Sequence, residues 1–177
     1  MNDRSPVKGK KCLSGNWRYS TMDDMKIAIV YATNSGGTQL AAQIVAETFA
    51  KHNLTAEIKE VQGSMPADLK NYDLVILASP SWDYEGLEGE PHPDYRPFME
   101  KFKGEDFSGR KFAVFGLGDS SYTYFCGAVQ HLEDFVKSLK GELVTQSLRI
   151  DGFYLDQQKS SQQLTDWTES LVTHLNG

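Results

Sequence analysis

The chain has 177 residues, of which 40% are hydrophobic and 24% are charged, and its formal net charge is −6. A chain of this length buries the core of one domain without disulfide bonds, and its composition excludes disorder as the general state. The acidic balance disfavours nucleic acid and anionic membranes as partners, since both are polyanions, and it favours a basic protein surface.

Residues 1–24 differ from the rest, because their five Lys and Arg outnumber their three Asp and give a net charge of +2. No apolar run in the sequence has the length of a membrane span, and none near the start forms a secretory signal. We expect residues 1–24 to be a loosely ordered tail, or an addition ahead of Met25 as the natural first residue, with a partner-binding arm as the alternative. Of the two cysteines, Cys12 lies in residues 1–24 and Cys126 lies in the rest of the chain. This separation disfavours a structural disulfide bond and favours free thiols in a reducing cytoplasm.

From residue 26 onward, apolar runs typical of buried strands alternate with segments whose apolar residues recur at helical spacing. In chain order, the expected strands are 26–31, 55–61, 74–78, 111–116 and 143–150. The expected helices begin at residue 38 and run near 95–103, over 124–140 and over 162–175. This alternation predicts an α/β fold with three layers, in which a doubly wound, five-stranded parallel sheet is covered on both faces. Charged residues in the second strand place it near an edge.

The segment between the first strand and the first helix, ATNSGGTQ, contains small, hydroxyl, amide and glycine residues and no charge. A loop that leads into a helix presents free backbone N–H groups at the positive end of the helix dipole, and such sites bind anions. No Lys follows the second glycine, so this is not the GxxxxGK[ST] loop that binds triphosphates. The neutral donors predict a site for one terminal phosphate, with an ordinary capped turn as the alternative.

Two aromatic residues follow the third and fourth expected strands. Trp82 comes after LVILA, and Tyr122 comes after KFAVFG. The carboxyl ends of parallel strands meet at one rim, which is where open sheets bind ligands. Each residue alone is typical of packing, but together with the phosphate loop they predict a flat aromatic ligand with a phosphate tail.

The stretches YATNSGGT, PSWDYEG and FGLGDSSYTYFCGAV, the last followed by LRIDG, resemble the three flavin-binding loops and the last strand of flavodoxins, especially short-chain ones. The resemblance covers residues 25–177, which it implies to be one flavodoxin-like domain that binds FMN. It also implies the strand order 2-1-3-4-5, with FMN at the switch point between the first and third strands, an arrangement that flavodoxins exemplify. The stretch ELVTQSLRI lacks the insertion of long-chain members, so we expect the last strand to run uninterrupted.

The resemblance implies roles for the residues of these loops. Residues 33–38 would hold the FMN phosphate, Trp82 would shield the inner face of the flavin, and Tyr122 would stack on its outer face. The peptide groups of 117–119 and 124–126 would meet the pyrimidine edge, with Cys126 as a small, inert buried residue. The implied cofactor-binding residues are Thr33, Asn34, Ser35, Gly36, Gly37, Thr38, Pro80, Ser81, Trp82, Asp83, Tyr84, Leu117, Gly118, Asp119, Tyr122, Tyr124, Phe125 and Cys126.

Two positions depart from the family pattern. Gly37 stands where many relatives have Asn, which removes one side-chain contact from the phosphate loop. Asp83 stands where many relatives have a glycine whose peptide flips when the flavin is reduced. A left-handed backbone at a residue other than glycine costs roughly 1 kcal/mol or more, so this flip should be less favourable here.

The function implied by the resemblance is that of a one-electron carrier, which shuttles electrons between a reductase and acceptor enzymes without turning over a substrate. The alternatives are an FMN-dependent NAD(P)H:quinone reductase, which a Tyr122 covering the flavin disfavours, and a flavin-free phosphate-binding domain. The four histidines are scattered, so we expect neither a catalytic acid–base set nor a metal site. We expect a cytoplasmic monomer that binds neither nucleic acid nor membranes.

Residues 83–94 contain five carboxylates and no Lys or Arg. The five are Asp83, Glu85, Glu88, Glu90 and Asp94. One carboxylate ~10 Å from an anionic reduced flavin destabilises that flavin by ~1.7 kcal/mol at an effective dielectric constant of ~20. This energy lowers the potential of a one-electron couple by about 70 mV. Several such charges would make the carrier strongly reducing, and they would dock on basic patches of redox partners.

Overall fold

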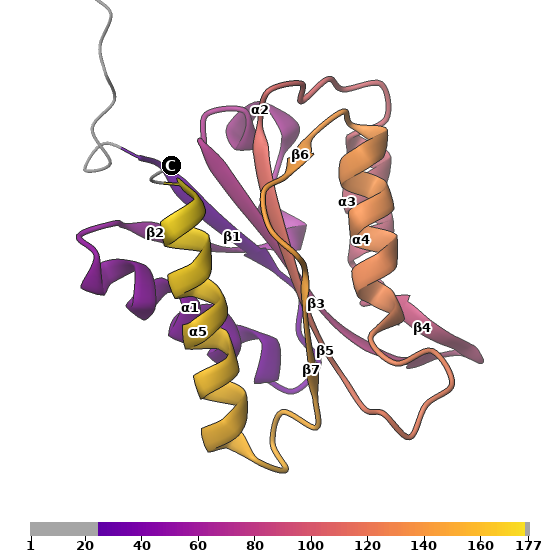
Figure 1. The fold of residues 1–177 in the computed structure, drawn as a ribbon. Helices are drawn as coiled ribbons and strands as arrows, with labels where there is room; N and C mark the ends of the chain where they lie inside the picture. The colour runs from indigo at the N-terminus through magenta and orange to yellow at the C-terminus, as the bar shows by residue number, and fades with distance from the viewer. Residues whose placement is uncertain (1–24, 176–177) are drawn as a thin grey trace, which may run out of the picture.

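The computed structural model describes residues 25–175, in which helices cover both faces of a central sheet (Figure 1). The expectations for residues 1–24 lie outside the described residues. Across the sheet, the order is β2 (Ala56–Glu60), β1 (Ile27–Tyr31), β3 (Leu74–Tyr84), β5 (Lys111–Gly118), and then β6 (Glu142–Leu143) and β7 (Leu148–Asp151), which both pair with β5. All of these pairs are parallel. With β6 and β7 counted as one broken strand, the predicted order 2-1-3-4-5 is confirmed, and the charged second strand lies at an edge.

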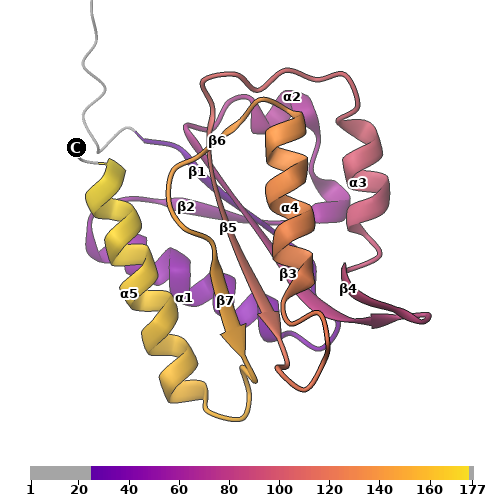
Figure 2. The ribbon, with the colours of Figure 1, turned by 45° about the vertical axis from the view of Figure 1, so that its right-hand side comes forward.

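The helices lie on the two sides of the sheet, as Figure 1 and Figure 2 show. On one side are α1 (Gly37–Lys51) and α5 (Gln157–Leu175), and on the other are α3 (Tyr95–Lys101) and α4 (Gly127–Ser138). A short 3-10 helix, η2 (Val61–Gly63), and the short α2 (Pro66–Leu69) connect β2 to β3. The three-layer, doubly wound architecture is therefore confirmed. Within residues 25–175, no helix has both the length and the apolar character needed to cross a bilayer.

Strand β1 is apolar throughout because it is buried on both faces. Ile27 and Ile29 pack in the core shared with α1 and α5, while Ala28 and Val30 pack in the core shared with α3 and α4. A large-to-small substitution such as Ile29→Ala would cost about 2–5 kcal/mol of stability. The strand therefore forms a rigid base for the loop that follows it.

Tyr95 connects β1 and β3 just before both strands reach the carboxyl edge. Its hydroxyl group accepts a hydrogen bond from the Ala78 N–H, at 3.1 Å, and lies 3.0 Å from the carbonyl oxygens of Val30 and Ala78. The side chain is fully buried, and this burial raises the pKa of the phenol well above its ordinary value. The phenol stays neutral and holds the two strand ends in a fixed relation.

A β-hairpin follows the third expected strand, where the sequence analysis expected no further strand before residue 111. Strand β3 extends to Tyr84 and pairs antiparallel with β4 (Leu87–Pro91). The two residues between them, Glu85 and Gly86, both have positive φ, as a type I′ hairpin turn requires. We call residues 83–90 the acidic hairpin, because the hairpin carries four of the five carboxylates of this segment.

The expected uninterrupted last strand is wrong, because residues 144–147 leave the ladder between β6 and β7. The indole Nε1–H of Trp167, on α5, donates to the Gln146 carbonyl at 2.9 Å, so that the carbonyl is satisfied outside the sheet.

Helix α5 also begins earlier than expected, at Gln157. Its start is capped by Asp156, whose carboxylate accepts from the Lys159 N–H at 3.0 Å.

Candidate functional site

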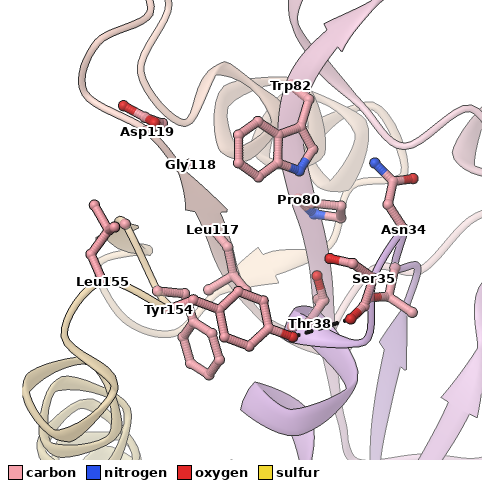
Figure 3. Close-up of a pocket in the computed structure, with 14 residues that line it drawn as sticks. Asn34, Ser35, Thr38, Pro80, Trp82, Leu117, Gly118, Asp119, Tyr154 and Leu155 are labelled. Carbon is pink, nitrogen blue, oxygen red and sulfur yellow. Dashed lines mark hydrogen bonds between the residues drawn. The ribbon is translucent and has the colours of Figure 1, made fainter.

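A pocket of about 200 Å³ lies at the carboxyl edge of the sheet, between the end of β3 and the loops that follow β1, β5 and β7 (Figure 3). Ten of the eighteen predicted residues line it, namely Thr33, Asn34, Ser35, Gly37, Thr38, Pro80, Trp82, Leu117, Gly118 and Asp119. The eight that do not line it are Gly36, Ser81, Asp83, Tyr84, Tyr122, Tyr124, Phe125 and Cys126. Four further residues line it that sequence reasoning missed, namely Gly152, Phe153, Tyr154 and Leu155.

The loop between β1 and α1 forms a tight turn. Gly36 has a φ of +85°, a left-handed conformation that glycine adopts without strain, and its N–H donates to Oγ1 of Thr33 at 3.0 Å. Helix α1 starts at the next residue, and its first turn contains no acidic residue. The free N–H groups at the start of α1 therefore lie at the pocket, and no carboxylate in the first turn offsets their partial positive charge.

Thr38, in the first turn of α1, is a buried residue whose side chain lines the pocket (Figure 3). Only 1% of it is exposed, and its Oγ1 has no hydrogen-bond partner among the described residues. Thr48, on the same helix, is equally buried, but its hydroxyl donates to the Ile44 carbonyl at 2.8 Å. Because a buried hydroxyl without a partner is costly, Thr38 marks a position for an acceptor that the protein does not supply.

Trp82 and Tyr122, the expected aromatic pair, contact each other in the structure. Trp82 lies near the end of β3 and is 36% exposed, and its ring meets that of Tyr122 edge to face, with centroids 6.1 Å apart and planes inclined by 79°. Two rings that stack on opposite faces of a flat ligand lie parallel and about 7 Å apart, at van der Waals distance from it. One of these side chains must therefore rotate before both can stack on a flavin.

The loop that carries Tyr122 is held at its base. Ser120 donates to the carboxylate of Asp151 through its N–H, at 2.8 Å, and through its hydroxyl group, at 2.6 Å. The carboxylate of Asp119 accepts from the Ser121 N–H at 2.8 Å, and the hydrogen bonds with Ser121 lower the pKa of this carboxyl. These bonds fix where the loop leaves β5, at the edge of the pocket.

Two predicted residues, Ser81 and Cys126, face the core instead of the pocket. The hydroxyl of Ser81 accepts from the Ala128 N–H at 3.2 Å and so anchors the start of α4. The Cys126 thiol points at the carbonyl oxygens of Gly116 and Ile150, at 3.7 Å each. Burial raises its pKa to about 12, so the thiol is neutral at physiological pH and fits the inert role expected from the sequence.

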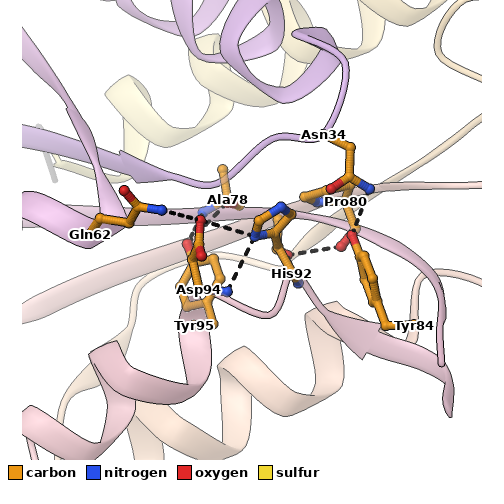
Figure 4. A network of polar contacts seen from close by, with 9 residues as sticks. Asn34, Gln62, Ala78, Pro80, Tyr84, His92, Asp94 and Tyr95 are labelled. Carbon is orange, nitrogen blue, oxygen red and sulfur yellow. Dashed lines mark hydrogen bonds and ion pairs between the residues drawn. The ribbon is translucent and has the colours of Figure 1, made fainter.

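Tyr84 connects the acidic hairpin to the loop between β1 and α1 (Figure 4). Its hydroxyl group accepts from Nδ2 of Asn34 at 3.0 Å, and its ring meets that of His92 edge to face, with centroids 5.8 Å apart. Burial raises the pKa of the Tyr84 phenol to about 12. His92 lies 3.3 Å from a carboxylate oxygen of Asp94 and is thus a structural neighbour of the hairpin rather than a lining residue.

The hairpin also contacts the segment of Tyr124 and Phe125. The N–H of Tyr124 donates to the Glu88 carboxylate at 2.8 Å, so this peptide group is already engaged by the protein. The Tyr124 side chain is 63% exposed, whereas Phe125 packs half-buried beside α4. The Asp83 carboxylate accepts from the Gly86 N–H at 2.7 Å and stabilises the hairpin turn. The three predicted residues Asp83, Tyr124 and Phe125 therefore hold neighbouring segments together and do not line the pocket.

The fourth wall of the pocket comes from the segment between β7 and α5. Phe153 is buried, whereas Tyr154 and Leu155 are exposed. The Tyr154 hydroxyl donates to the Ser35 carbonyl at 3.1 Å, so this wall contacts the loop between β1 and α1 (Figure 3). The only sequence signal was that this segment follows a strand end, because its residues form neither a polar cluster nor a helical pattern.

Comparisons with known proteins identify the family of this chain. A flavodoxin family model matches residues 29–164. The flavodoxin of Maridesulfovibrio salexigens is 39% identical over 128 residues, which are 72% of this chain and 86% of that protein. The chain belongs to the flavodoxin family. Oxidised flavodoxin 2 from Bacillus cereus has a TM-score of 0.76 at 28% identity, covering 84% of this chain and 98% of that one. A Fusobacterium nucleatum flavodoxin bound to flavin mononucleotide has a TM-score of 0.71 at 19% identity, covering 84% and 97%.

Flavodoxins are electron-transfer flavoproteins rather than enzymes with substrate turnover, and FMN is the cofactor of this one. The pocket fits the phosphate end of FMN. The Thr38 hydroxyl lacks a protein partner, and the first turn of α1 carries no carboxylate. Since the lining residues include no Lys, Arg or His, neutral donors and the helix dipole are what this flavodoxin offers an anion.

Proposed function

We propose that residues 33–38 of this flavodoxin hold the FMN phosphate, with the Thr38 hydroxyl and the first N–H groups of α1 as donors. One observation carries the proposal: Oγ1 of Thr38 is buried at the pocket and has no partner among the described residues. A phosphate oxygen would supply the missing acceptor, and the positive end of the α1 dipole would favour its charge.

The flavin ring system lies in the apolar part of the pocket in this proposal. Pro80 and Leu117 form its floor and exclude water, and Trp82 and Tyr122 cover its two faces after their edge contact opens. Gly118 and Asp119 also line the pocket, and in this proposal they meet polar atoms of the ring system. Ser81, Asp83, Tyr84, Tyr124, Phe125 and Cys126 act through the loops that they hold in place.

The proposed carrier has a low potential and shuttles electrons between a reductase and acceptor enzymes. Bound FMN supplies the one-electron redox chemistry, and the protein sets its electrostatic surroundings. The carboxylates of the acidic hairpin disfavour added negative charge on the flavin, which makes the reduced protein a stronger donor. The same carboxylates would dock on basic patches of redox partners. We further propose that residues 25–177 form one domain that works as a cytoplasmic monomer.

Anaerobic stopped-flow measurements test this function. The full chain loaded with FMN is mixed with NADPH alone, and with NADPH plus a catalytic amount of a flavodoxin reductase. We expect the visible absorbance of the flavin to fall quickly only in the second mixture, because a carrier takes its electrons from the reductase. Rapid reduction by NADPH alone, followed by turnover of an added quinone, would show a quinone reductase. Failure to retain FMN through desalting would remove the proposal altogether.

A further inference from the structure

We propose that Tyr154 is a positioning residue for the phosphate loop, which it holds from the segment between β7 and α5. This inference rests on the proposed binding of the FMN phosphate at residues 33–38. Tyr154 would act through the Ser35–Gly36 peptide group, whose orientation shapes the turn into α1.

Both ends of the Ser35–Gly36 peptide group are held by side chains. Its carbonyl oxygen accepts from the Tyr154 hydroxyl at 3.1 Å, and its N–H donates to Oγ1 of Thr33 at 3.0 Å. The same peptide precedes the left-handed Gly36, the residue at which the chain turns into α1. With both ends held, the peptide has one orientation, and the N–H groups that follow it are directed at the pocket.

The Tyr154 ring also occupies the space beside Gly37. A Cβ atom added at Gly37 would lie 3.2 Å from Cε2 of Tyr154 and 3.4 Å from its Cζ, closer than ordinary van der Waals contact to the first of these atoms. Glycine at position 37 and tyrosine at position 154 are therefore complementary in shape. The ring covers the first residue of α1 on one side and limits the access of water to the start of the helix.

Tyr154 keeps this place although it is 57% exposed, because its segment is anchored on both sides. Before it, the Gly152 N–H donates to the Gly118 carbonyl at 2.9 Å, and the buried Phe153 contacts the Tyr154 ring edge to face. After it, Asp156 caps α5. The hydroxyl therefore reaches the phosphate loop from a fixed support, which lowers the entropy lost when the loop closes on an anion.

The test compares FMN with riboflavin, which lacks the phosphate. Dissociation constants are measured by quenching of flavin fluorescence for the wild type, Tyr154→Phe and the matched control Tyr72→Phe, whose hydroxyl contacts Glu57 and Lys59 elsewhere. We expect Tyr154→Phe to weaken FMN binding about fivefold, the value of one hydrogen bond, and to leave riboflavin binding unchanged. The control should change neither.

A second pair of variants tests the contact with Gly37 independently of the hydroxyl. We expect Gly37→Ala to weaken FMN binding several-fold in the wild type and to have no further effect when Tyr154 is already alanine, because the crowding ring is then absent. The role of Tyr154 is overturned if Tyr154→Phe binds FMN as the wild type does, or if FMN and riboflavin weaken by one common factor. If the wild type itself binds no FMN, the proposed function fails first, so the two failures are distinguishable.

Discussion

The rings of Trp82 and Tyr122 touch edge to face, with their centroids 6.1 Å apart. Trp82 lines the pocket together with Thr38, Pro80 and Leu117, whereas Tyr122 does not line it. Under the proposed function, this edge contact opens when the flavin stacks between the two rings, whereas the start of α1 already has the arrangement that would hold the phosphate.

Replacement of Trp82 by alanine should weaken FMN binding. Stacking on one aromatic face contributes about 1–3 kcal/mol, so we expect the dissociation constant to rise about 5- to 150-fold. Trp82→Phe keeps a smaller aromatic face and should give an intermediate value. Fluorescence titration of the apoprotein measures all three constants, and an unchanged constant for Trp82→Ala would remove Trp82 from the site.

Thr38→Val should separate stability from binding. Valine has the shape of threonine but no hydroxyl, so removing an unpartnered buried oxygen should leave the free energy of unfolding unchanged or raise it by up to about 1 kcal/mol. A hydrogen bond to a charged group contributes about 1.5–3 kcal/mol, so FMN binding should weaken about 10- to 150-fold.

The matched control for this variant is Thr48→Val. The Thr48 hydroxyl donates to the Ile44 carbonyl on the same helix, away from the pocket. Its loss should lower stability slightly and leave FMN binding unchanged. Urea denaturation and FMN titration measure the two quantities, and equal FMN affinities in Thr38→Val and the wild type would contradict the role of Thr38.

The acidic hairpin should govern the rate of electron transfer with basic partners. Asp83→Asn and Glu85→Gln together remove two charges beside the pocket, so we expect the second-order rate constant to fall several-fold at low ionic strength. At high salt the difference should disappear, because screening shortens the range of these charges. Glu142→Gln, at the opposite edge of the sheet, is the control, and an equal effect of that variant would argue against docking at the hairpin.

The buried thiol of Cys126 makes stability depend on pH in the alkaline range. Burial raises its pKa to about 12 in the folded protein, compared with about 8.5 for an unfolded cysteine. Between these values the unfolded chain has lost a proton that the native chain keeps, so stability falls as the pH rises, by up to about 1.4 kcal/mol per pH unit.

Comparison with Cys126→Ala isolates this contribution, with Cys12→Ser in both proteins so that one thiol remains at most. Between about pH 9 and pH 10.5, the free energy of unfolding from urea titrations should fall more steeply for the parent than for Cys126→Ala. Below about pH 8 the two curves should run parallel. Parallel curves over the whole range would mean that the thiol titrates normally.

Tyr95→Phe should destabilise the fold near the site. The hydroxyl accepts from the Ala78 N–H and contacts two strand carbonyls in a fully buried position, so its removal should cost about 1–3 kcal/mol. Tyr124→Phe, at an exposed side chain, should change stability by less than about 0.5 kcal/mol. The denaturation midpoints of the variants are compared with that of the wild type. Equal midpoints for Tyr95→Phe and the wild type would mean that the hydroxyl bonds of Tyr95 do not contribute to stability.

The main elements of the fold could be predicted because the spacing of apolar residues within each short segment indicates which positions are buried. β1 is apolar at all five positions, and α4 shows a clear helical stripe, so each was found from a short window. The start of α5 was missed because QQKSSQ is polar, although Asp156 caps it. The break before β7 was missed because it depends on the Trp167 indole, which lies far along the chain.

Part of the pocket lining could be predicted because it follows strands that short apolar runs reveal. The phosphate loop and Trp82 follow strands that the sequence reveals, so their meeting at one edge could be inferred from topology alone. Tyr154 could not be found in this way, because its contribution depends on a hydrogen bond to Ser35 across 119 positions of sequence. The hairpin was missed because Glu85–Gly86 is not one of the usual Asn-Gly or Asp-Gly turns and because carboxylates dominate the segment, although Trp82, Tyr84 and Leu87 alternate with polar residues.

The most direct test of the account is the ratio of the wild-type dissociation constants for FMN and riboflavin, measured in one buffer. If the neutral donors around Thr38 hold the phosphate, FMN should bind at least about 100-fold more tightly than riboflavin, as expected for several hydrogen bonds to a charged group. Equal affinities for the two flavins would contradict the assignment of residues 33–38 as the phosphate site.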